Sequence, residues 1–168
     1  MSYCPSDTTS TTSSMVYTPR GDSIAIESLS LRDNTSDAVP WPGNTYIIQD
    51  RDSKQSITTC NTVFASNVSS TDRDTHWLCV ESGGYFGFFN KQNNIYLSFQ
   101  NDRIQSASDF GSREFFLPIR HPRGGYMLMV PYGSDKLKQV AILGGTTELI
   151  ARQHAGIIWE FVQVLESN

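Results

Sequence analysis

The sequence predicts an all-β domain in which one four-stranded unit occurs three times. The first observation is a tyrosine that follows glycine at the start of each unit. Tyr46, Tyr85 and Tyr126 hold this position, and they lie 39 and 41 residues apart. Short apolar runs separated by polar breaks follow each tyrosine, as expected for strands joined by turns.

The second observation is an aromatic-x-apolar segment that ends each unit. These segments begin at Trp77, Phe115 and Trp159, which are 38 and 44 residues apart. A period near forty with four short strands fits propeller blades and trefoil leaves. Three units are too few for a propeller, which has at least about four blades. Three units do close a β-trefoil, a barrel capped by three hairpins.

We expect the trefoil domain to span residues 41–168, with repeats at about 43–82, 83–121 and 122–165. Asn and Gly pairs mark reversals between its strands. The glycines before the tyrosines are interpreted as turn residues, because glycine enters a sharp turn without a Cβ penalty; they are Gly83, Gly84, Gly124 and Gly125. The predicted strands are 46–49, 56–59, 62–66, 77–80, 85–89, 95–99, 103–107, 115–119, 126–130, 137–143, 148–151 and 158–164.

Residues 1–40 are predicted to form a tail and a lead-in segment. The first 14 residues are rich in Ser and Thr, and we expect disorder there because they cannot bury enough apolar surface. Residues 15–32 alternate apolar side chains at Ile24 and Ile26, which fits either one extra strand or a short helix over the domain. Residues 33–42 become proline-rich and predict a linker or loop.

Two segments of the third repeat resemble a known family. Arg120-His121-Pro122-Arg123-Gly124-Gly125-Tyr126, followed by Ile158-Trp159-Glu160-Phe161-Val162, is similar to small intracellular fungal β-trefoil proteins of the fascin-like and ricin-B-like kinds. The resemblance covers about residues 42–165 and implies the trefoil fold. The Gln-x-Trp that ends each ricin-B repeat is absent, which argues against a ricin-type sugar site. The corresponding places read Thr75-His76-Trp77, Arg113-Glu114-Phe115 and Ile157-Ile158-Trp159.

Composition excludes some classes of partner. The formal charge is −4 and the pI about 5.3, so the chain lacks the basic footprint of a nucleic-acid-binding protein. No apolar run reaches the roughly 18 residues that a membrane helix needs. The N-terminus has no secretory signal pattern. Cys4, Cys60 and Cys79 have no motif spacing, which favours reduced thiols in the cytoplasm.

Aromatic side chains are expected to fill the barrel, because the interior of a small barrel is packed with side chains at matching heights. On the closing strand, a period of two places Trp159, Phe161 and Gln163 on one face. In the middle repeat, the predicted interior residues are Tyr85, Phe86, Phe88, Phe115 and Phe116.

Three histidines and two arginines are candidates for catalysis. Histidine titrates near neutral pH and serves as a general acid or base, and paired guanidinium groups hold anions. Under an enzyme hypothesis, the catalytic residues would be His76, His121, His154, Arg120 and Arg123. The spacing of His and Cys matches no metal motif, and no phosphate-binding loop precedes a helix, so we expect no metal and no cofactor.

Polar and aromatic loop residues are candidates for ligand binding, since a trefoil barrel is a scaffold whose loops vary. Asn and Asp side chains bond sugar hydroxyls, and an aromatic face packs on a pyranose. The same residues are also ordinary turn formers. The candidates are Trp41, Asn90, Asn93, Asn94, Tyr96, Asn101, Asp102, Tyr132 and Asp135.

Three functions follow from these observations. The first is a binding module for a carbohydrate or another polar small molecule. The second is a cofactor-independent cyclase, isomerase or lyase of fungal secondary metabolism, in which histidine, arginine and carboxylates perform acid–base chemistry. The third is an interaction module that inhibits a protease or binds actin. The oligomeric state and the ligand are not determined by the sequence.

Overall fold

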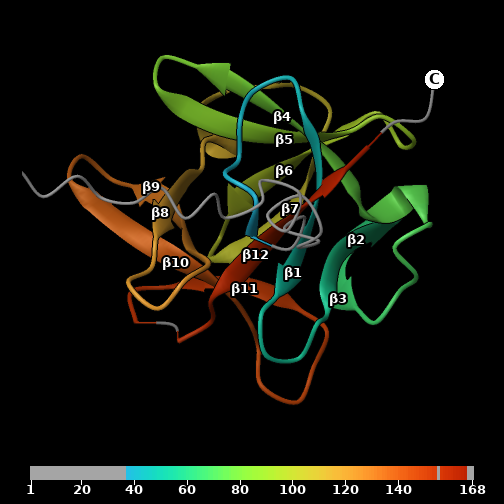
Figure 1. Ribbon diagram of the computed structural model, residues 1–168. Coiled ribbons are helices and arrows are strands. Elements are labelled where there is room, and N and C mark those ends of the chain that lie inside the picture. Colours follow the sequence, from blue (N-terminus) through green and yellow to red (C-terminus); the bar gives the residue numbers. More distant parts are fainter. Residues whose placement is uncertain (1–36, 155, 166–168) are drawn as a thin grey trace, which may run out of the picture. The chain divides into compact units, whose positions relative to one another are not determined.

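A computed structural model describes residues 37–154 and 156–165 (Figure 1). The expectations for residues 1–36 lie outside this range. In the described part, twelve strands and two short 3-10 helices follow one another along the chain. They are β1 (Thr45–Asp50), β2 (Ser56–Cys60), β3 (Thr62–Ser66), η3 (Arg73–Thr75), β4 (His76–Ser82), β5 (Tyr85–Asn90), β6 (Ile95–Gln100), β7 (Arg103–Ala107), η4 (Ser112–Glu114), β8 (Leu117–Arg120), β9 (Tyr126–Tyr132), β10 (Lys136–Ile142), β11 (Leu149–Arg152) and β12 (Trp159–Val164).

Six strands close a barrel. β1 pairs with β12 over six residues and with β4 on its other side. β4 pairs with β5, and β8 with β9. A bridge between Phe86 and Phe116 joins β5 to β8, and a bridge between Trp159 and Tyr126 joins β12 to β9. Because the last barrel strand pairs with the first, the sheet has no open edge at this point.

The other six strands form three hairpins: β2–β3, β6–β7 and β10–β11. They also contact one another, for example through the bridge between Ile150 and Arg103 and the bond from the Ala65 amide to the Thr147 carbonyl (2.8 Å). A six-stranded barrel capped by three hairpins is a β-trefoil. The chain therefore has the predicted all-β fold, and all twelve predicted strands are present.

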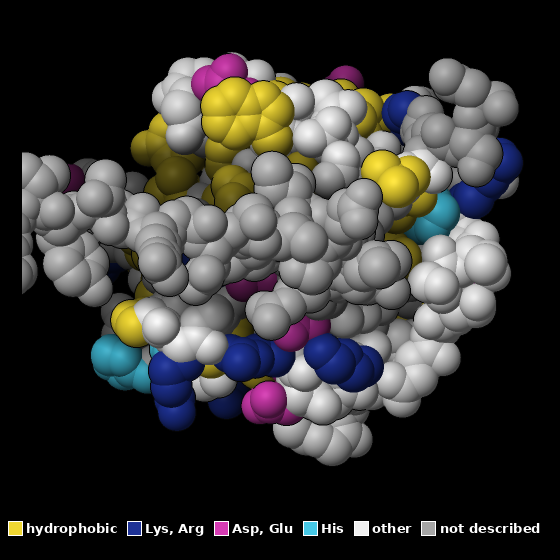
Figure 2. All heavy atoms as spheres, in the orientation of Figure 1, with side chains coloured by type: hydrophobic (Ala, Val, Ile, Leu, Met, Phe, Trp, Pro, Cys, Tyr) yellow, Lys and Arg dark blue, Asp and Glu magenta, His cyan; other side chains and the backbone are white. Residues whose placement is uncertain are grey.

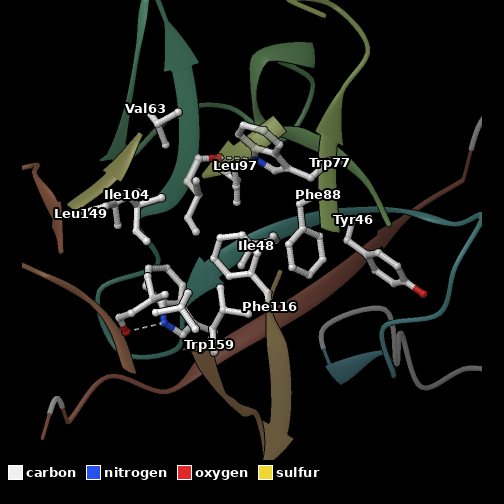
Figure 3. Packing of buried hydrophobic residues seen from close by; sticks show 14 of the residues in the cluster. Tyr46, Ile48, Val63, Trp77, Phe88, Leu97, Ile104, Phe116, Leu149 and Trp159 are labelled. Atoms are coloured by element: carbon white, nitrogen blue, oxygen red, sulfur yellow. Dashed lines mark hydrogen bonds between the residues drawn. The ribbon is translucent and has the colours of Figure 1, made fainter. Parts of the chain in front are cut away.

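The core fills the barrel and continues under the three hairpins, and large side chains from all three leaves converge in it (Figure 3). Trp77 and Trp159 are fully buried and hold equivalent places in leaves one and three. Each indole Nε1–H donates to a backbone carbonyl twenty or so positions away, that of Ile57 (2.9 Å) or Val140 (3.0 Å). A buried indole needs such a partner, so each tryptophan also attaches its hairpin to the barrel.

The repeat has a different register from the one that the tyrosines predict. Tyr46 is opposite Trp77 and Tyr126 is opposite Trp159, but in leaf two the corresponding pair is Phe86 and Phe116. Tyr46, Phe86 and Tyr126 lie 40 residues apart in both intervals. Aligning Tyr85 with the other two tyrosines was wrong by one residue, and on a strand one residue reverses the face.

Five aromatic rings of leaf two therefore lie outside the barrel, and we call them the outer aromatic row. They contact in sequence: Tyr85 stacks on Phe115 (4.8 Å), Phe115 meets Phe110 (5.6 Å), Phe110 stacks on Tyr96 (5.3 Å) and Tyr96 meets Phe89 (4.7 Å). The prediction that Tyr85 and Phe115 fill the barrel is wrong, whereas Phe88 and Phe116 are fully buried inside it.

Gly87 explains how Phe110 joins this row. A Cβ at Gly87 would lie 2.2 Å from the Phe110 ring, so the ring occupies the space that a side chain would need. Phe110 belongs to the loop between β7 and β8, which this contact holds against β5. The loop then runs into η4, and β8 begins only at Leu117, two residues later than the predicted start.

The predicted turn glycines are confirmed, because Gly83, Gly84, Gly124 and Gly125 all have positive φ. At Gly125 a Cβ would also lie 2.5 Å from Ile158. The segment before β1 packs on the barrel: Ala38 donates to the Phe161 carbonyl (3.0 Å), and the Tyr46 hydroxyl donates to that of Val39 (3.0 Å). No helix in the described residues is long and apolar enough to cross a membrane.

Candidate functional site

Three corners of the trefoil correspond to one another, one at each junction between leaves. At two of them the turn of a cap hairpin and the first turn of the next leaf line a common hollow. The corner between leaves two and three contains a hollow of about 590 Å³, lined by residues 99–102, 112–113 and 131–133. We call it the Tyr132 hollow. It gathers three of the predicted ligand-binding residues, Asn101, Asp102 and Tyr132.

Tyr132 reaches this hollow because β9 is long. β1 and β5 end four residues after Tyr46 and Phe86, at Asp50 and Asn90, whereas β9 runs six residues past Tyr126. The residue that corresponds to Asp50 and Asn90 is Val130, which is fully buried. An apolar residue cannot bond the backbone of a tight turn, so the β9–β10 hairpin continues and carries Tyr132 outward, where it is 46% exposed.

Lys138 organises the charges of the Tyr132 hollow. It lies across from Val130 on β10, and its Nζ is 3.8 Å from the centre of the Tyr132 ring and 5.9 Å from that of Phe99. The same ammonium forms an ion pair with Asp102, and its side chain is only 12% exposed, compared with 65% for Asp102. Lys138 thus covers one face of the tyrosine and neutralises the carboxylate beside it.

The turn between β6 and β7 contributes polar groups to the Tyr132 hollow. Asn101 and Asp102 have φ of +52° and +62°, conformations that Asn and Asp tolerate better than other side chains. The Asp102 carbonyl accepts a bond from the Ala151 amide (3.0 Å), which ties the turn to β11. The carboxylate and amide of these residues therefore stand on a fixed backbone.

The corner between leaves three and one contains a second hollow, of about 490 Å³, lined by Asp50, Ser53, Gln55, residues 142–147 and Ile157. The carboxylate in this hollow, that of Asp50, already has hydrogen-bond partners within the protein. Asp50 is buried and accepts bonds from the amide of Asp52 (3.3 Å) and from the amide and hydroxyl of Ser53. These bonds close the β1–β2 turn, so Asp50 acts there as a turn residue.

The corner between leaves one and two is filled by Asn90. The expectation that Asn90 lies in an exposed loop is wrong, because the residue is fully buried. Its amide nitrogen donates to the carbonyls of Arg73, Asp74 and His76, and its oxygen accepts the Asn93 amide (3.0 Å). Asn93 bonds Asp74 (2.7 Å), and Asn94 supplies positive φ. These three predicted residues build a turn.

The other predicted binding residues are dispersed. Trp41 is 67% exposed in the segment before β1, and its amide donates to the Tyr46 hydroxyl (2.9 Å). Tyr96 belongs to the outer aromatic row. Asp135 is exposed in the β9–β10 turn and does not line the Tyr132 hollow. Sequence reasoning missed Gln100, Arg113 and Lys138, since only the fold brings their three segments to one place.

Arg120, His121 and Arg123 form part of a structural network. Arg120 bonds Asp37 (2.9 Å) and the Tyr126 hydroxyl (3.0 Å), and these two contacts, the Tyr126 bond first, raise the pKa of its guanidinium. The His121 ring accepts the Arg123 amide (3.2 Å). The Arg120 guanidinium is thus already paired with the Asp37 carboxylate. An anionic ligand would have to displace that carboxylate in order to bind Arg120.

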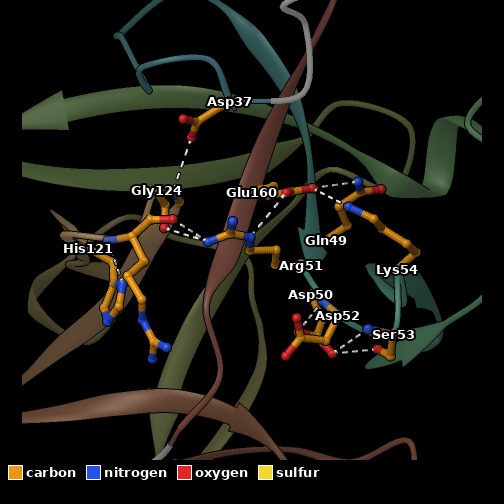
Figure 4. A network of polar contacts seen from close by, with 12 residues as sticks. Asp37, Gln49, Asp50, Arg51, Asp52, Ser53, Lys54, His121, Gly124 and Glu160 are labelled. Carbon is orange, nitrogen blue, oxygen red and sulfur yellow. Dashed lines mark hydrogen bonds and ion pairs between the residues drawn. The ribbon is translucent and has the colours of Figure 1, made fainter.

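Neighbouring charges continue this network across β1 and β12 (Figure 4). Arg51 donates to the carbonyls of Arg123 (2.6 Å) and Gly124 (3.2 Å), and Glu160 accepts Lys54 (2.6 Å) and Gln49 (3.2 Å). On the surface, Lys and Arg side chains form a row with Asp and Glu among them (Figure 2). The network joins the turn after β8 to leaf one.

The histidines do not form a catalytic group. His76 contacts the Ser70 carbonyl (2.9 Å) and lines a groove with Arg73 and Lys91. His121 lies in the turn before β9, and His154 is exposed after β11. In residues 37–154 and 156–165, no histidine forms an ion pair with a carboxylate, and no cluster of three His, Cys, Asp or Glu residues could hold a metal. This arrangement does not support the enzyme hypothesis.

Comparison with known proteins supports the fold assignment and assigns the chain to no family. No family model and no curated protein matches the sequence. A GlcNAcα1-4Gal-releasing endo-β-galactosidase from Clostridium perfringens is similar in structure, with a TM-score of 0.64 at 13% identity over 73% of this chain. The chain spans only 33% of that enzyme.

Two smaller proteins are matched over nearly their full length. SeviL, solved with an asialo-GM1 saccharide, gives a TM-score of 0.59 at 12% identity and covers 72% of this chain and 96% of its own. A ricin B-like lectin from Macrolepiota procera, solved with lactose, gives 0.52 at 14% identity and covers 77% and 92%. At such identity the likeness establishes the β-trefoil fold alone.

Proposed function

We propose that the protein binds a carbohydrate in the Tyr132 hollow. The observation that carries this proposal is the exposed Tyr132 ring beside Asn101 and Asp102, where predicted binding residues from two different leaves line a common hollow. An aromatic face with a polar rim is the arrangement that an amphipathic ligand such as a sugar needs.

Each group has a chemical role in this proposal. Lys138 covers one face of Tyr132, and the C–H face of a pyranose packs on the other. The Asp102 carboxylate accepts sugar hydroxyls, while the amides of Asn101 and Gln100 both donate and accept. Asp102 remains 65% exposed in its ion pair with Lys138, so its oxygens reach a ligand without breaking that pair.

Two of the similar structures support the proposal because they contain bound saccharides. SeviL and the Macrolepiota procera lectin were solved with saccharides. Neither shares more than 14% identity with this chain, so the place and kind of sugar are inferred from the residues of the Tyr132 hollow. Protease inhibition, actin binding and a cytoplasmic location stay predictions.

A glycan array followed by isothermal titration calorimetry tests the proposal. Tyr132→Ala removes the apolar surface on which the sugar packs, and we expect about tenfold weaker binding, which corresponds to a loss of about 1.4 kcal/mol of buried apolar contact. Trp41→Ala is the matched control, an exposed aromatic outside the hollow. Equal loss in both variants, or no glycan bound by the folded wild type, contradicts the proposal.

A further inference from the structure

We infer that Arg113 makes the Tyr132 hollow selective for sugars that carry a carboxylate. The inference rests on the proposed carbohydrate binding and adds the class of ligand. Arg113 lies in η4 and lines the hollow together with Asp102 and Tyr132. Its side chain is exposed.

The charges of the hollow are unbalanced. Its single carboxylate, that of Asp102, is already paired with Lys138. Several other cations have carboxylate partners: Arg51 and Lys54 share Glu160, and Arg103 pairs with Glu148. Among the described residues no carboxylate pairs with Arg113. The hollow therefore carries one uncompensated positive charge on a chain whose formal charge is −4.

The backbone under Arg113 is held from both sides. Glu114 is buried, its amide donates to the Gly111 carbonyl (3.1 Å), and its carboxylate accepts the Gly111 amide (2.8 Å). One residue before Gly111, Phe110 packs over Gly87 and joins the outer aromatic row. The loop is thus fixed while the Arg113 side chain stays free to meet a ligand. The outer aromatic row, which belongs to leaf two, thus helps to fix the loop that carries Arg113.

A guanidinium recognises a carboxylate with two parallel hydrogen bonds. The C6 carboxylate of a uronic acid and the C1 carboxylate of a sialic acid both offer this geometry on a ring that also stacks on Tyr132. The negative charge of the whole protein works against anionic ligands at long range, but salt screens that effect beyond about 8–10 Å. Selectivity then depends on the local contact with Arg113.

An array with three arms tests the inference: neutral galactosides, and the same scaffolds that end in galacturonic acid or in sialic acid. We expect the wild type to prefer one carboxylated arm, and the preferred arm identifies the source of the carboxylate. Arg113→Gln should weaken that binding about 10- to 100-fold, the scale of a charge-assisted hydrogen bond. It should weaken neutral binding far less, because a neutral sugar has no carboxylate for the guanidinium to pair with. Arg123→Gln is the matched control, an exposed arginine outside the hollow.

The outcomes separate the two proposals. If neutral and carboxylated sugars bind equally well, or if Arg113→Gln keeps the preference, the inference is overturned while carbohydrate binding stands. If the folded protein binds no member of any arm, carbohydrate binding fails and the selectivity fails with it. A preference for a carboxylated arm that Arg113→Gln abolishes and Arg123→Gln retains supports the inference.

Discussion

Leaves two and three share the barrel and differ at their first turn. Inside, Phe86 and Phe116 of leaf two take the places of Tyr126 and Trp159 of leaf three. At the turn, Asn90 of leaf two bonds four backbone groups and fills its corner, whereas Val130 of leaf three bonds none and the hairpin extends to Tyr132. The Asn90 side chain thus closes the first turn of leaf two, whereas the hairpin of leaf three continues past the equivalent position.

The largest expected effect concerns the shared interior. Phe116→Ala should lower the free energy of unfolding by about 3–5 kcal/mol, because it leaves a cavity in a fully packed barrel. Phe115 is the preceding residue in the chain and belongs to the outer aromatic row. Phe115→Ala should lower the free energy of unfolding clearly less, since that ring is half-buried. Urea denaturation of both variants measures the difference. The reverse order would restore the register that the tyrosines predict and would break the comparison.

Asn90→Val imposes the residue type of leaf three on leaf two. We expect a loss of about 1–3 kcal/mol in the free energy of unfolding, because the carbonyls of Arg73, Asp74 and His76 lose a buried donor. Asn93→Ala, which removes an exposed bond to Asp74, is the control and should cost less. If the Asn90→Val variant were as stable as the wild type, the Asn90 side chain would not be what holds this turn closed.

Tyr132→Ala should change stability little. The residue is 46% exposed and its main contact is with Lys138, a cation–π interaction of about 0.5–1 kcal/mol at an exposed site. Thermal denaturation of the variant beside the wild type measures this. Carbohydrate binding should fall much further than stability, and a melting temperature that collapses would mean that Tyr132 is a structural residue.

The smallest expected effect concerns two cysteines of leaf one, one buried in the barrel and one exposed at the end of a strand. Cys79 is buried and burial raises the pKa of its thiol to about 12, whereas Cys60 is exposed at the end of β2. At pH 8 a disulfide reagent should modify Cys60 quickly and Cys79 only after unfolding. The unfolded chain releases the Cys79 proton near pH 9.0 and the folded chain near 12, so this thiol lowers stability as pH rises between these values. Rapid modification of Cys79 in the native protein would contradict its burial.

Much of the fold follows from local chemistry. Alternation, turn-forming Asn and Gly, and a period near forty predicted the twelve strands and the trefoil, because these signals act within a few residues. The four glycines before the tyrosines took positive φ as expected. The error at Tyr85 arose because aromatic residues occupy both faces of β5, so that composition could not show which face is inside.

The candidate site depended on tertiary structure. Sequence alone proposed Asn90 and Asp102 for the same reason, as polar residues in turns, yet one is buried in a closed corner and the other lines a hollow. Lys138 meets Asp102 across 36 residues, and Arg113 arrives on a loop that Phe110 holds over Gly87. The sequence determined which segments form strands and turns. Only the packing of separate leaves decided which side chains meet, because such contacts depend on barrel closure and not on spacing along the chain.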